Sequence, residues 1–265
     1  MKEQILSRLS PAYPWKELLH CFPSIDSTND RLKALARQGA PHGTVLVAGH
    51  QTAGHGRMGR SFLSPEGQGV YMSILLRPDC PPGDLMHLTC AAAVAMCDAV
   101  EAAAGFRPGI KWTNDLVHGK RKLGGILTEL GLSPKGKADY AIIGIGINCL
   151  QGSSDFAPEI RDMAGSLALV RGEPVDPFRV AAAMMEALWQ MDGLLLTQKD
   201  DILNRYRTDC ITIHQDISLV RGDEIRYGHA LDVDENGALV VRFSSGEILP
   251  VNSGEVSVRG MYGYV

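Results

Sequence analysis

Residues 109–130, GIKWTNDLVHGKRKLGGILTEL, contain two strand-like segments on either side of a His-Gly-Lys turn at residues 118–120. This pattern predicts a β-hairpin. On such a hairpin Lys111 and Lys122 would lie on partner arms, so that both ammonium groups can face one pocket. The hairpin is therefore the first candidate for a functional site.

The polar residues of this segment have two interpretations. Asn114 and Asp115, at a strand end, can hold a sugar hydroxyl or a magnesium ion. A solvated charged hairpin is the more usual outcome for such a run, and Trp112 is of a type found more often in a core than against a cofactor. This segment alone leaves both interpretations open.

Helical and strand patterns precede the hairpin. A helix is expected from Ser27 to about Gln38, because Ser27 can cap its start, Asp30 completes a capping-box pattern and Gly39 supplies a stop. Two aliphatic runs predict strands, and an apolar run interrupted by two acidic residues predicts an alanine-rich core helix without a membrane span. These runs are residues 44–48, 70–76 and 85–106.

In the second half of the chain, long predicted elements give way to short ones. A strand is expected over residues 140–148, and a long helix from an Asp176 cap, with Pro177 in its first turn, to about Thr197. From Ile211 onward short strands alternate with turn sequences, which indicates a small antiparallel barrel. We therefore predict a mixed α/β domain over residues 1–210 and an all-β tail domain over residues 211–265.

A long polar loop connects the two predicted aliphatic strands. Residues 49–69, GHQTAGHGRMGRSFLSPEGQG, combine glycines with Arg57 and Arg60. Glycine allows the backbone to approach a ligand closely, and arginine binds carboxylate or phosphate through a rigid fork. An anion-binding loop and an ordinary surface loop are equally good interpretations of this segment taken alone.

A weaker signal follows at residues 144–148, Gly-Ile-Gly-Ile-Asn. No third glycine follows at the spacing of a dinucleotide-binding turn. Asn148 can read a base edge while Gly144 and Gly146 allow close approach. The alternative is a central strand whose glycines only accommodate packing.

Composition narrows the classes of function. The formal net charge is −4, and the sequence holds no long basic stretch, so a nucleic-acid surface is not expected. The six cysteines form no C-x-x-C pair, which indicates reduced, mostly buried thiols. The first 15 residues are too polar for a signal peptide. We expect a cytoplasmic protein.

Together these motifs resemble the biotin protein ligase family. The matching segments run from about Ile25 to Arg259 and are Ser27-Thr28-Asn29, Gln51–Arg60, Lys111–Asp115, Arg121–Leu127 and Gly144–Asn148. The resemblance implies an α+β fold: a mixed β-sheet flanked by helices, like class II aminoacyl-tRNA synthetases, with a small C-terminal SH3-like β-barrel. It also implies activation of biotin with ATP and Mg²⁺, and transfer of biotin to a lysine of a biotin carboxyl carrier protein domain.

The resemblance assigns a role to each matching residue. Arg57 and Lys122 would be catalytic, and Asp115 would hold the metal. Biotin would be bound by Ser27, Thr28, Asn29, Gln51, Gly54, His55, Gly56, Arg57, Trp112, Lys122, Gly125 and Gly144. ATP and the adenylate would be bound by Arg57, Arg60, Phe62, Lys111, Asn114, Asp115, Lys122 and Asn148.

Two residues depart from the family's pattern. His55 stands where the family's loop has its first arginine, which can lower the charge of the loop at neutral pH. Thr113 replaces the usual proline. Both departures bear on how tightly the phosphates or the intermediate are held.

The resemblance also leaves other functions open. Only 24 residues precede Ile25, so we expect the type without an N-terminal DNA-binding domain, with no nucleic-acid or membrane partner, as a monomer or a homodimer. A lipoate or octanoate protein ligase or transferase would share the fold. A noncatalytic biotin-adenylate sensor is the other alternative, but it would need a DNA-binding module.

Overall fold

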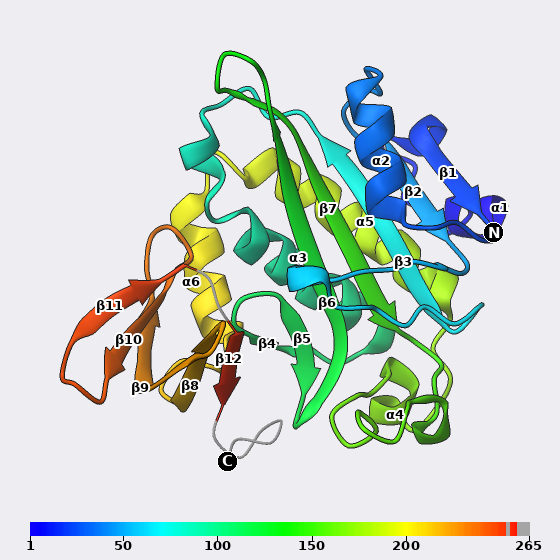
Figure 1. Cartoon of the computed structure of the whole chain (residues 1–265). Coiled ribbons are helices and arrows are strands. Elements are labelled where there is room, and N and C mark those ends of the chain that lie inside the picture. The colour runs from blue at the N-terminus through cyan, green and yellow to red at the C-terminus, as the bar shows by residue number, and fades with distance from the viewer. Residues whose placement is uncertain (253–254, 259–265) are drawn as a thin grey trace.

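A seven-stranded mixed sheet organises the larger part of the protein in the computed structural model, which describes residues 1–252 and 255–258. The strand order is β1-β2-β3-β7-β6-β5-β4 (Figure 1). The β1–β2 pair is parallel, and the other neighbouring pairs are antiparallel. The strands are β1 (Leu19–Phe22), β2 (Val45–Ala48), β3 (Gly69–Leu76), β4 (Gly109–Lys111), β5 (Asp115–His118), β6 (Arg121–Leu132) and β7 (Ala138–Asn148).

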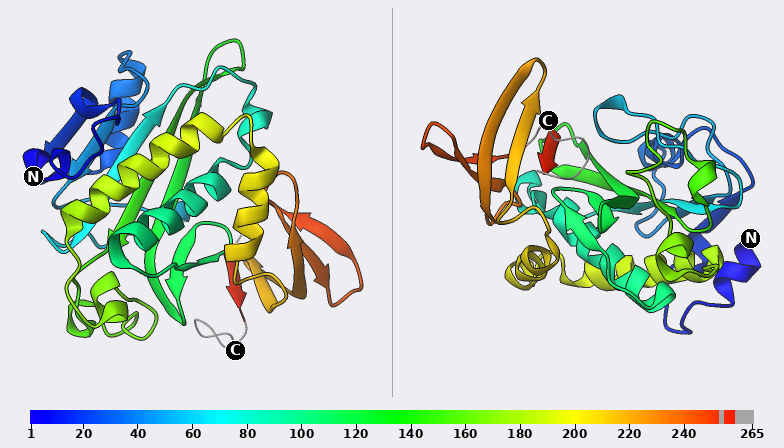
Figure 2. Two further views of the ribbon diagram at one scale, coloured as in Figure 1. Left: turned by 180° about the vertical axis from the view of Figure 1, so that it is seen from behind. Right: turned by 90° about the horizontal axis from the view of Figure 1, so that it is seen from below.

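Helices cover both faces of this sheet. Figure 2 shows α3 and α5 across one face, whereas α2 contacts β2, β3 and β7 from the opposite face. The α-helices are α1 (Lys2–Leu6), α2 (Thr28–Arg37), α3 (Leu88–Ala104), α4 (Leu167–Arg171), α5 (Pro177–Leu194) and α6 (Lys199–Asp209). Short 3₁₀ turns are η1 (Lys16–Leu18), η2 (Arg57–Gly59), η3 (Pro82–Leu85) and η4 (Ser153–Asp155).

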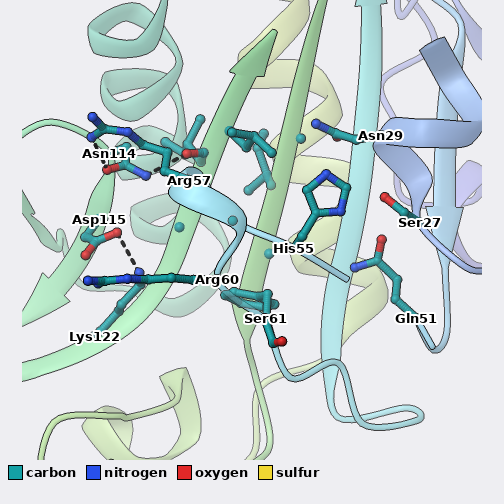
Figure 3. A pocket seen from close by; sticks show the side chains of 18 of the residues that line it. Ser27, Asn29, Gln51, His55, Arg57, Arg60, Ser61, Asn114, Asp115 and Lys122 are labelled. Carbon is teal, nitrogen blue, oxygen red and sulfur yellow. Dashed lines mark hydrogen bonds and ion pairs between the residues drawn. The ribbon is translucent and has the colours of Figure 1, made fainter. Parts of the chain in front are cut away.

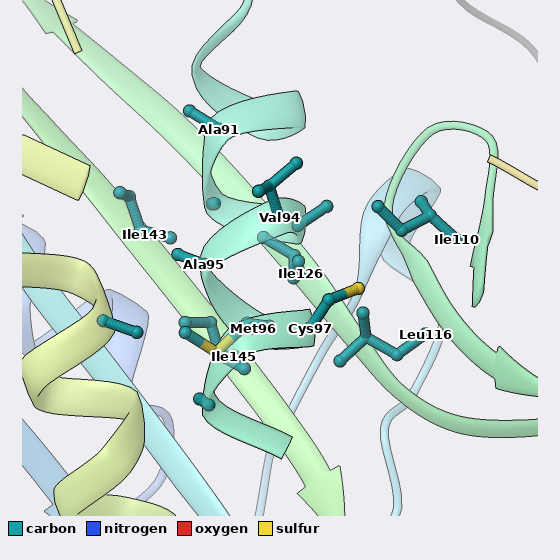
Figure 4. Close-up of a cluster of buried hydrophobic side chains, with 14 of the residues drawn as sticks. Ala91, Val94, Ala95, Met96, Cys97, Ile110, Leu116, Ile126, Ile143 and Ile145 are labelled. Atoms are coloured by element: carbon teal, nitrogen blue, oxygen red, sulfur yellow. The ribbon is translucent and has the colours of Figure 1, made fainter. Parts of the chain in front are cut away.

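The apolar helix predicted at residues 85–106 is confirmed as a core helix. Residues 82–104 are long and apolar enough to cross a membrane, but 72% of the apolar 18-residue window within them is buried inside the protein. Small side chains such as Ala91 and Ala95 let α3 pack closely against the sheet, where it meets Ile126, Ile143 and Ile145 (Figure 4). Burial of this helix against the sheet is sufficient to explain why residues 85–106 are so hydrophobic.

The helix caps follow the sequence closely. Ser27 Oγ accepts from the Asp30 backbone N–H at 3.3 Å, and Gly39 has φ +88° just after α2 ends. The predicted capping box is only half formed, because the Ser27 backbone N–H donates to Asp26 Oδ1 at 2.7 Å. Asp176 caps α5, which ends at Leu194, three residues before the predicted Thr197.

The predicted hairpin forms between β5 and β6, with His118 paired with Arg121. The expectation that Lys111 and Lys122 lie on partner arms is wrong. Lys111 lies on a third strand, β4, where it pairs with Asp115. The chain reverses between Lys111 and Asp115, so the segment makes three strands instead of two.

The tail forms a five-stranded antiparallel sheet of order β11-β10-β9-β8-β12. Short strands alternate with turns over β8–β11, as the sequence predicts. The strands are β8 (Asp216–Arg221), β9 (Glu224–Val233), β10 (Leu239–Phe243), β11 (Ile248–Val251) and β12 (Glu255–Val258). The predicted tail domain also includes residues 253–254 and 259–265, which lie outside the described residues.

Polar contacts connect the tail to the β4–β5 region. The Trp112 indole N–H donates to the Gly237 carbonyl at 3.0 Å, and the Trp112 backbone N–H donates to Thr212 Oγ1 at 2.9 Å. Tyr206, at the end of α6, donates to the Thr113 carbonyl at 3.0 Å. The tail therefore contacts the segment that holds the candidate site.

Candidate active site

A cavity of about 200 Å³ opens on the α2 face of the sheet. Side chains alternate between the faces of a strand, so Gly144 and Gly146 of β7 lie on the same face as Ile142, which packs under α2. On β6 the partners of these residues are Leu127, opposite Gly144, and Gly125, opposite Gly146. Three glycines on one face leave the hollow that larger residues would fill.

Two of these glycines are needed for specific neighbours. A Cβ at Gly144 would lie 1.9 Å from Asn29 Oδ1, and one at Gly146 would lie 2.4 Å from the Phe62 ring. Phe62 also packs edge-on against Tyr71, with ring centroids 6.4 Å apart. The structure thus shows the alternative interpretation, a central strand in which Gly144 and Gly146 accommodate neighbouring side chains, while close approach of a ligand stays a prediction.

One end of the cavity is a buried cluster of neutral hydrogen-bonding groups. Gln51 Oε1 accepts from the Thr28 backbone N–H at 2.9 Å and from Thr28 Oγ1 at 3.1 Å. Ser73 Oγ lies 2.7 Å from Thr28 Oγ1 and 2.6 Å from Asn29 Oδ1. Since these side chains bond one another, they are held in fixed positions before any ligand arrives.

The glycine-rich loop lies over the cavity and supplies its arginines. The Gly56 N–H donates to the Arg60 carbonyl at 2.7 Å, and the Phe62 N–H donates to the Gly54 carbonyl at 2.9 Å. The 3₁₀ turn η2 lies within this closed loop and carries Arg57 (Figure 3). His55 Nδ1 lies 3.7 Å from Asp30 Oδ2, which places the loop beside α2.

The other end of the cavity is cationic. Arg57 donates to Asn114 Oδ1 at 3.1 Å, and Lys122 Nζ lies 2.6 Å from Asp115 Oδ1 (Figure 3). Asn114 is itself fixed, because its amide donates to the Ile126 carbonyl at 2.7 Å. Arg60 and the buried Lys111 complete a lining of four cationic side chains and one carboxylate. This end suits a ligand that carries more than one negative charge.

Sixteen of the 18 predicted site residues line this one cavity. Gly54 and Asn148 do not line it. Asn148 is buried, where it donates to the Gly165 carbonyl at 2.9 Å and accepts from Gln151 Nε2 at 3.1 Å. The residues brought together are Ser27, Thr28, Asn29, Gln51, His55, Gly56, Arg57, Arg60, Phe62, Lys111, Trp112, Asn114, Asp115, Lys122, Gly125 and Gly144.

Sequence reasoning missed part of the lining. Besides Gly146, which was expected to allow close approach, the additional lining residues are Ser61, Ile126, Leu127, Ile145 and Val256. The period-two alternation within residues 125–129 was a usable signal for Leu127, because it places Leu127 on the face of Gly125. Val256 comes from β12 of the tail, and no local pattern links it to residues more than 100 positions away.

A second cavity of about 150 Å³ adjoins the first and shares Arg57, Trp112, Ile126 and Leu127 with it. Its far wall comes from the tail, at Asn236, Gly237, Ala238 and Asn252. The candidate site therefore extends toward the contact between the two sheets.

Within residues 1–252 and 255–258, no group of three or more His, Cys, Asp or Glu side chains could hold a metal ion. All six cysteines are free thiols, and five of them are buried, as predicted. Burial raises the pKa of Cys90 and that of Cys149 to about 12, so both remain protonated at neutral pH. A thiol in that state is a poor nucleophile.

Two segments of the chain match known protein families. Residues 21–148 match the Biotin/lipoate A/B protein ligase family, and residues 212–259 match the Biotin protein ligase C terminal domain. The bifunctional ligase/repressor BirA of Bacillus spizizenii is 38% identical, over 84% of this chain and 68% of that protein. The biotin--[acetyl-CoA-carboxylase] ligase of Paracoccus denitrificans is 31% identical, over 85% of this chain and 95% of that protein.

Solved structures agree with these sequence matches. The biotin protein ligase from Aquifex aeolicus, determined in complex with biotin and ATP, superimposes with a TM-score of 0.75. It is 28% identical to this chain, and the match covers 91% of this chain and 98% of that one.

Proposed function

Because the chain belongs to the biotin protein ligase family, we propose that it activates biotin with ATP to biotinyl-5'-AMP and then transfers biotin to a lysine of an acceptor protein. One observation carries the proposal. A single cavity has a neutral hydrogen-bonding cluster at one end and four cationic side chains at the other. Biotin has a neutral ureido ring at one end and a carboxylate at the other, so its polar groups match the two ends of the cavity.

We assign the ureido and thiophane rings to the neutral end. Thr28, Asn29 and Gln51 present donors and acceptors there, with Ser27 at the start of α2 beside them. Gly125 and Gly144 leave room for the rings, and Trp112 forms a wall of the cavity. The biotin carboxylate would then extend toward Arg57 and Lys122.

Adenylation joins two anions, so repulsion between them has to be offset. A carboxylate oxygen of biotin forms a bond to the α-phosphorus of ATP, the bond from that phosphorus to the bridging oxygen breaks, and pyrophosphate leaves. Arg57 and Lys122 would contact both partners and hold the attacking oxygen in line. Their attraction strengthens as charge shifts in the transition state. Arg60 and Lys111 would bind phosphate oxygens.

The second step consumes the adenylate. The neutral lysine amine attacks the acyl carbon, the bond from that carbon to the AMP oxygen breaks, and the amine gives up a proton. With Cys90 and Cys149 protonated and buried, no covalent enzyme intermediate is invoked. The glycine-rich loop would cover the mixed anhydride and exclude water.

The site fits Mg²⁺ that is bound largely by the substrate. Mg²⁺ usually takes one or two carboxylates together with phosphate oxygens. Asp115 is the one carboxylate in the described lining of the cavity, and it would be the protein ligand. When bound there, Mg²⁺ would withdraw charge from the departing pyrophosphate.

The nucleotide would lie near Phe62 and Asn148. Phe62 lines the cavity, whereas the Asn148 amide is occupied by Gly165 and Gln151. Contact between Asn148 and adenine would therefore require these two bonds to be exchanged. We expect the segment after β7 to move when ATP binds.

We assign the remaining properties by family membership. Residues 1–210 would form the catalytic domain, and residues 211–265 would close into an SH3-like barrel. The acceptor would be a biotin carboxyl carrier protein domain of a biotin-dependent carboxylase. The protein would act in the cytoplasm as a monomer or homodimer, without nucleic acid or membrane.

The direct test supplies the protein with ATP, Mg²⁺, radiolabelled biotin and a biotin carboxyl carrier domain. Label on the acceptor that depends on ATP supports the proposal. Octanoate and lipoate, tested with a lipoyl domain under the same conditions, separate it from the alternative chemistry of the fold. Preferred transfer of either acid, or adenylate formation without transfer, would reject the assignment.

A further inference from the structure

Glu129 lies behind the neutral end of the cavity. It follows Gly125 and Leu127 at period two on β6, so it points to the same face of the sheet. Its two carboxylate oxygens have different partners. Oε2 accepts from Asn29 Nδ2 at 2.8 Å, and Oε1 accepts from Lys33 Nζ at 3.0 Å.

The carboxylate decides which way the Asn29 amide faces. The other end of that amide lies 2.6 Å from Ser73 Oγ, and a hydroxyl can donate or accept. Ser73 therefore tolerates either orientation of Asn29. An ionised carboxylate can only accept, so Glu129 requires the NH₂ group of Asn29 to face β6 and leaves Oδ1 facing Ser73.

The orientation of the Asn29 amide also determines where the hydroxyl proton of Ser73 points. Ser73 has a single hydroxyl proton, and Asn29 Oδ1 takes it, so none is left for Thr28 Oγ1 at 2.7 Å. Thr28 Oγ1 also has a single proton, for which Ser73 Oγ at 2.7 Å and Gln51 Oε1 at 3.1 Å compete as acceptors. Asn29 is 5% exposed and Ser73 is fully buried, so water cannot easily compensate for a wrong orientation.

Lys33 places a cation beside the Glu129 carboxylate. Burial alone would lower the pKa of Lys33, but hydrogen bonds to Asp30 and Glu129 raise it above its ordinary value. Lys33 also lies 2.7 Å from Asp30 Oδ1. At neutral pH the Glu129 carboxylate thus has a fixed cation on one oxygen and Asn29 on the other.

We propose that Glu129 is a positioning residue for the biotin end of the site, because it fixes the orientation of the Asn29 amide and hence the donors and acceptors that biotin meets. Glu129 acts through Asn29 and does not line the cavity. The inference rests on the proposed function, since it presumes that biotin is the ligand of this end.

The near-isosteric change Glu129→Gln is expected to reverse the orientation of the Asn29 amide. The Lys33 ammonium can only donate, so it will claim the single oxygen of the new amide. The NH₂ group of Gln then faces Asn29, which must turn its Oδ1 toward it. We expect the Kd for biotin to rise about tenfold, as expected for the loss of one or two buried hydrogen bonds, with the KM for ATP unchanged.

The matched control is Lys33→Met, which removes the cation and leaves Glu129 bonded to Asn29. We expect biotin affinity within about threefold of wild type, since that contact survives. In the double variant Lys33→Met/Glu129→Gln the amide is released and can turn its oxygen to Asn29. The double variant should therefore bind biotin more tightly than Glu129→Gln alone.

Calorimetry of biotin binding separates the outcomes, with thermal melting as the folding control. A purely structural Lys33–Glu129 pair predicts equal losses in the two single variants and no recovery in the double, and that result overturns the proposal. So does wild-type affinity in Glu129→Gln. If Glu129→Gln does not fold, Glu129→Asp, one methylene shorter, should weaken biotin binding, and wild-type affinity there rejects the proposal. A wild-type protein that binds no biotin rejects the proposed function itself.

Discussion

Lys122 Nζ and Asp115 Oδ1 lie 2.6 Å apart on neighbouring strands of the hairpin, and both residues line the cavity. The lysine side chain is 38% exposed, and the aspartate side chain 21%. A pair this accessible contributes little to folding. Its role is better explained by ligand binding, because the ammonium group is held at the cationic end of the cavity, where an anionic ligand can reach it.

Lys122→Ala should therefore slow adenylate formation strongly and leave folding nearly unchanged. Losing one such contact costs about 3 kcal/mol, or a hundredfold or more in rate. Lys122→Arg should recover little, because a planar fork does not replace a compact ammonium. Biotin-dependent pyrophosphate release is the readout, and Lys120→Ala, on the exposed turn, is the matched control. A folded Lys122→Ala protein with near wild-type rates would contradict the assignment.

The loop at residues 54–61 should change in protease sensitivity when ligand binds. Its turn η2 has no side-chain hydrogen bond at its N-cap, and its arginines line the cavity where anions are expected. We expect faster cleavage in the free protein than with saturating biotin and ATP. Mass spectrometry of early fragments locates the cuts. Equal cleavage rates in both states would count against closure of the loop.

Gly144→Ala should impair biotin binding, because the new Cβ would lie 1.9 Å from Asn29 Oδ1 and displace that side chain. Overpacking of this kind costs about 1–3 kcal/mol of stability as well. Gly193→Ala, within α5, meets no atom within 4 Å and should stabilise the protein by about 0.5–1 kcal/mol. Calorimetry and melting on both variants test the contrast. Normal affinity in Gly144→Ala would show that Asn29 is not a ligand contact.

Stability should fall as the pH drops below about 6.5, partly because of His87. Burial lowers the pKa of His87 from its ordinary value of 6.5, and its Nε2 donates to the Leu195 carbonyl at 2.9 Å. Above 6.5 the residue is neutral in both states and adds no pH dependence. Below 6.5 the unfolded chain binds the proton first, so unfolding is favoured until the folded protein titrates too.

The variant His87→Gln isolates this contribution. Gln can keep a donor for the Leu195 carbonyl, but it does not titrate, so the slope of melting temperature against pH between about 5 and 6.5 should decrease. Melting curves of both proteins across that range provide the measurement. An unchanged slope would assign the acid sensitivity to other groups.

The features that could be predicted from the sequence are those that depend on a few neighbouring residues. Ser27, Gly39 and Asp176 act as caps at the expected positions, and the glycine and arginine motifs meet at one cavity. The β4–β5 reversal was missed because residues 112–114 contain no glycine or proline, and Asn114, which is common in turns, was interpreted as a ligand-binding residue. Glu129 and Val256 were missed because their relation to the site depends on strand pairing and on docking of the tail, which no short segment encodes.

The bond between the Trp112 indole and the Gly237 carbonyl gives the molecule a built-in optical reporter. The chain has three tryptophans, and the other two, Trp15 and Trp189, both pack against Tyr13. Replacing those two with phenylalanine leaves one buried indole at the contact between the sheets. Its emission should shift to the red when the tail separates, so fluorescence can follow that separation without an attached dye.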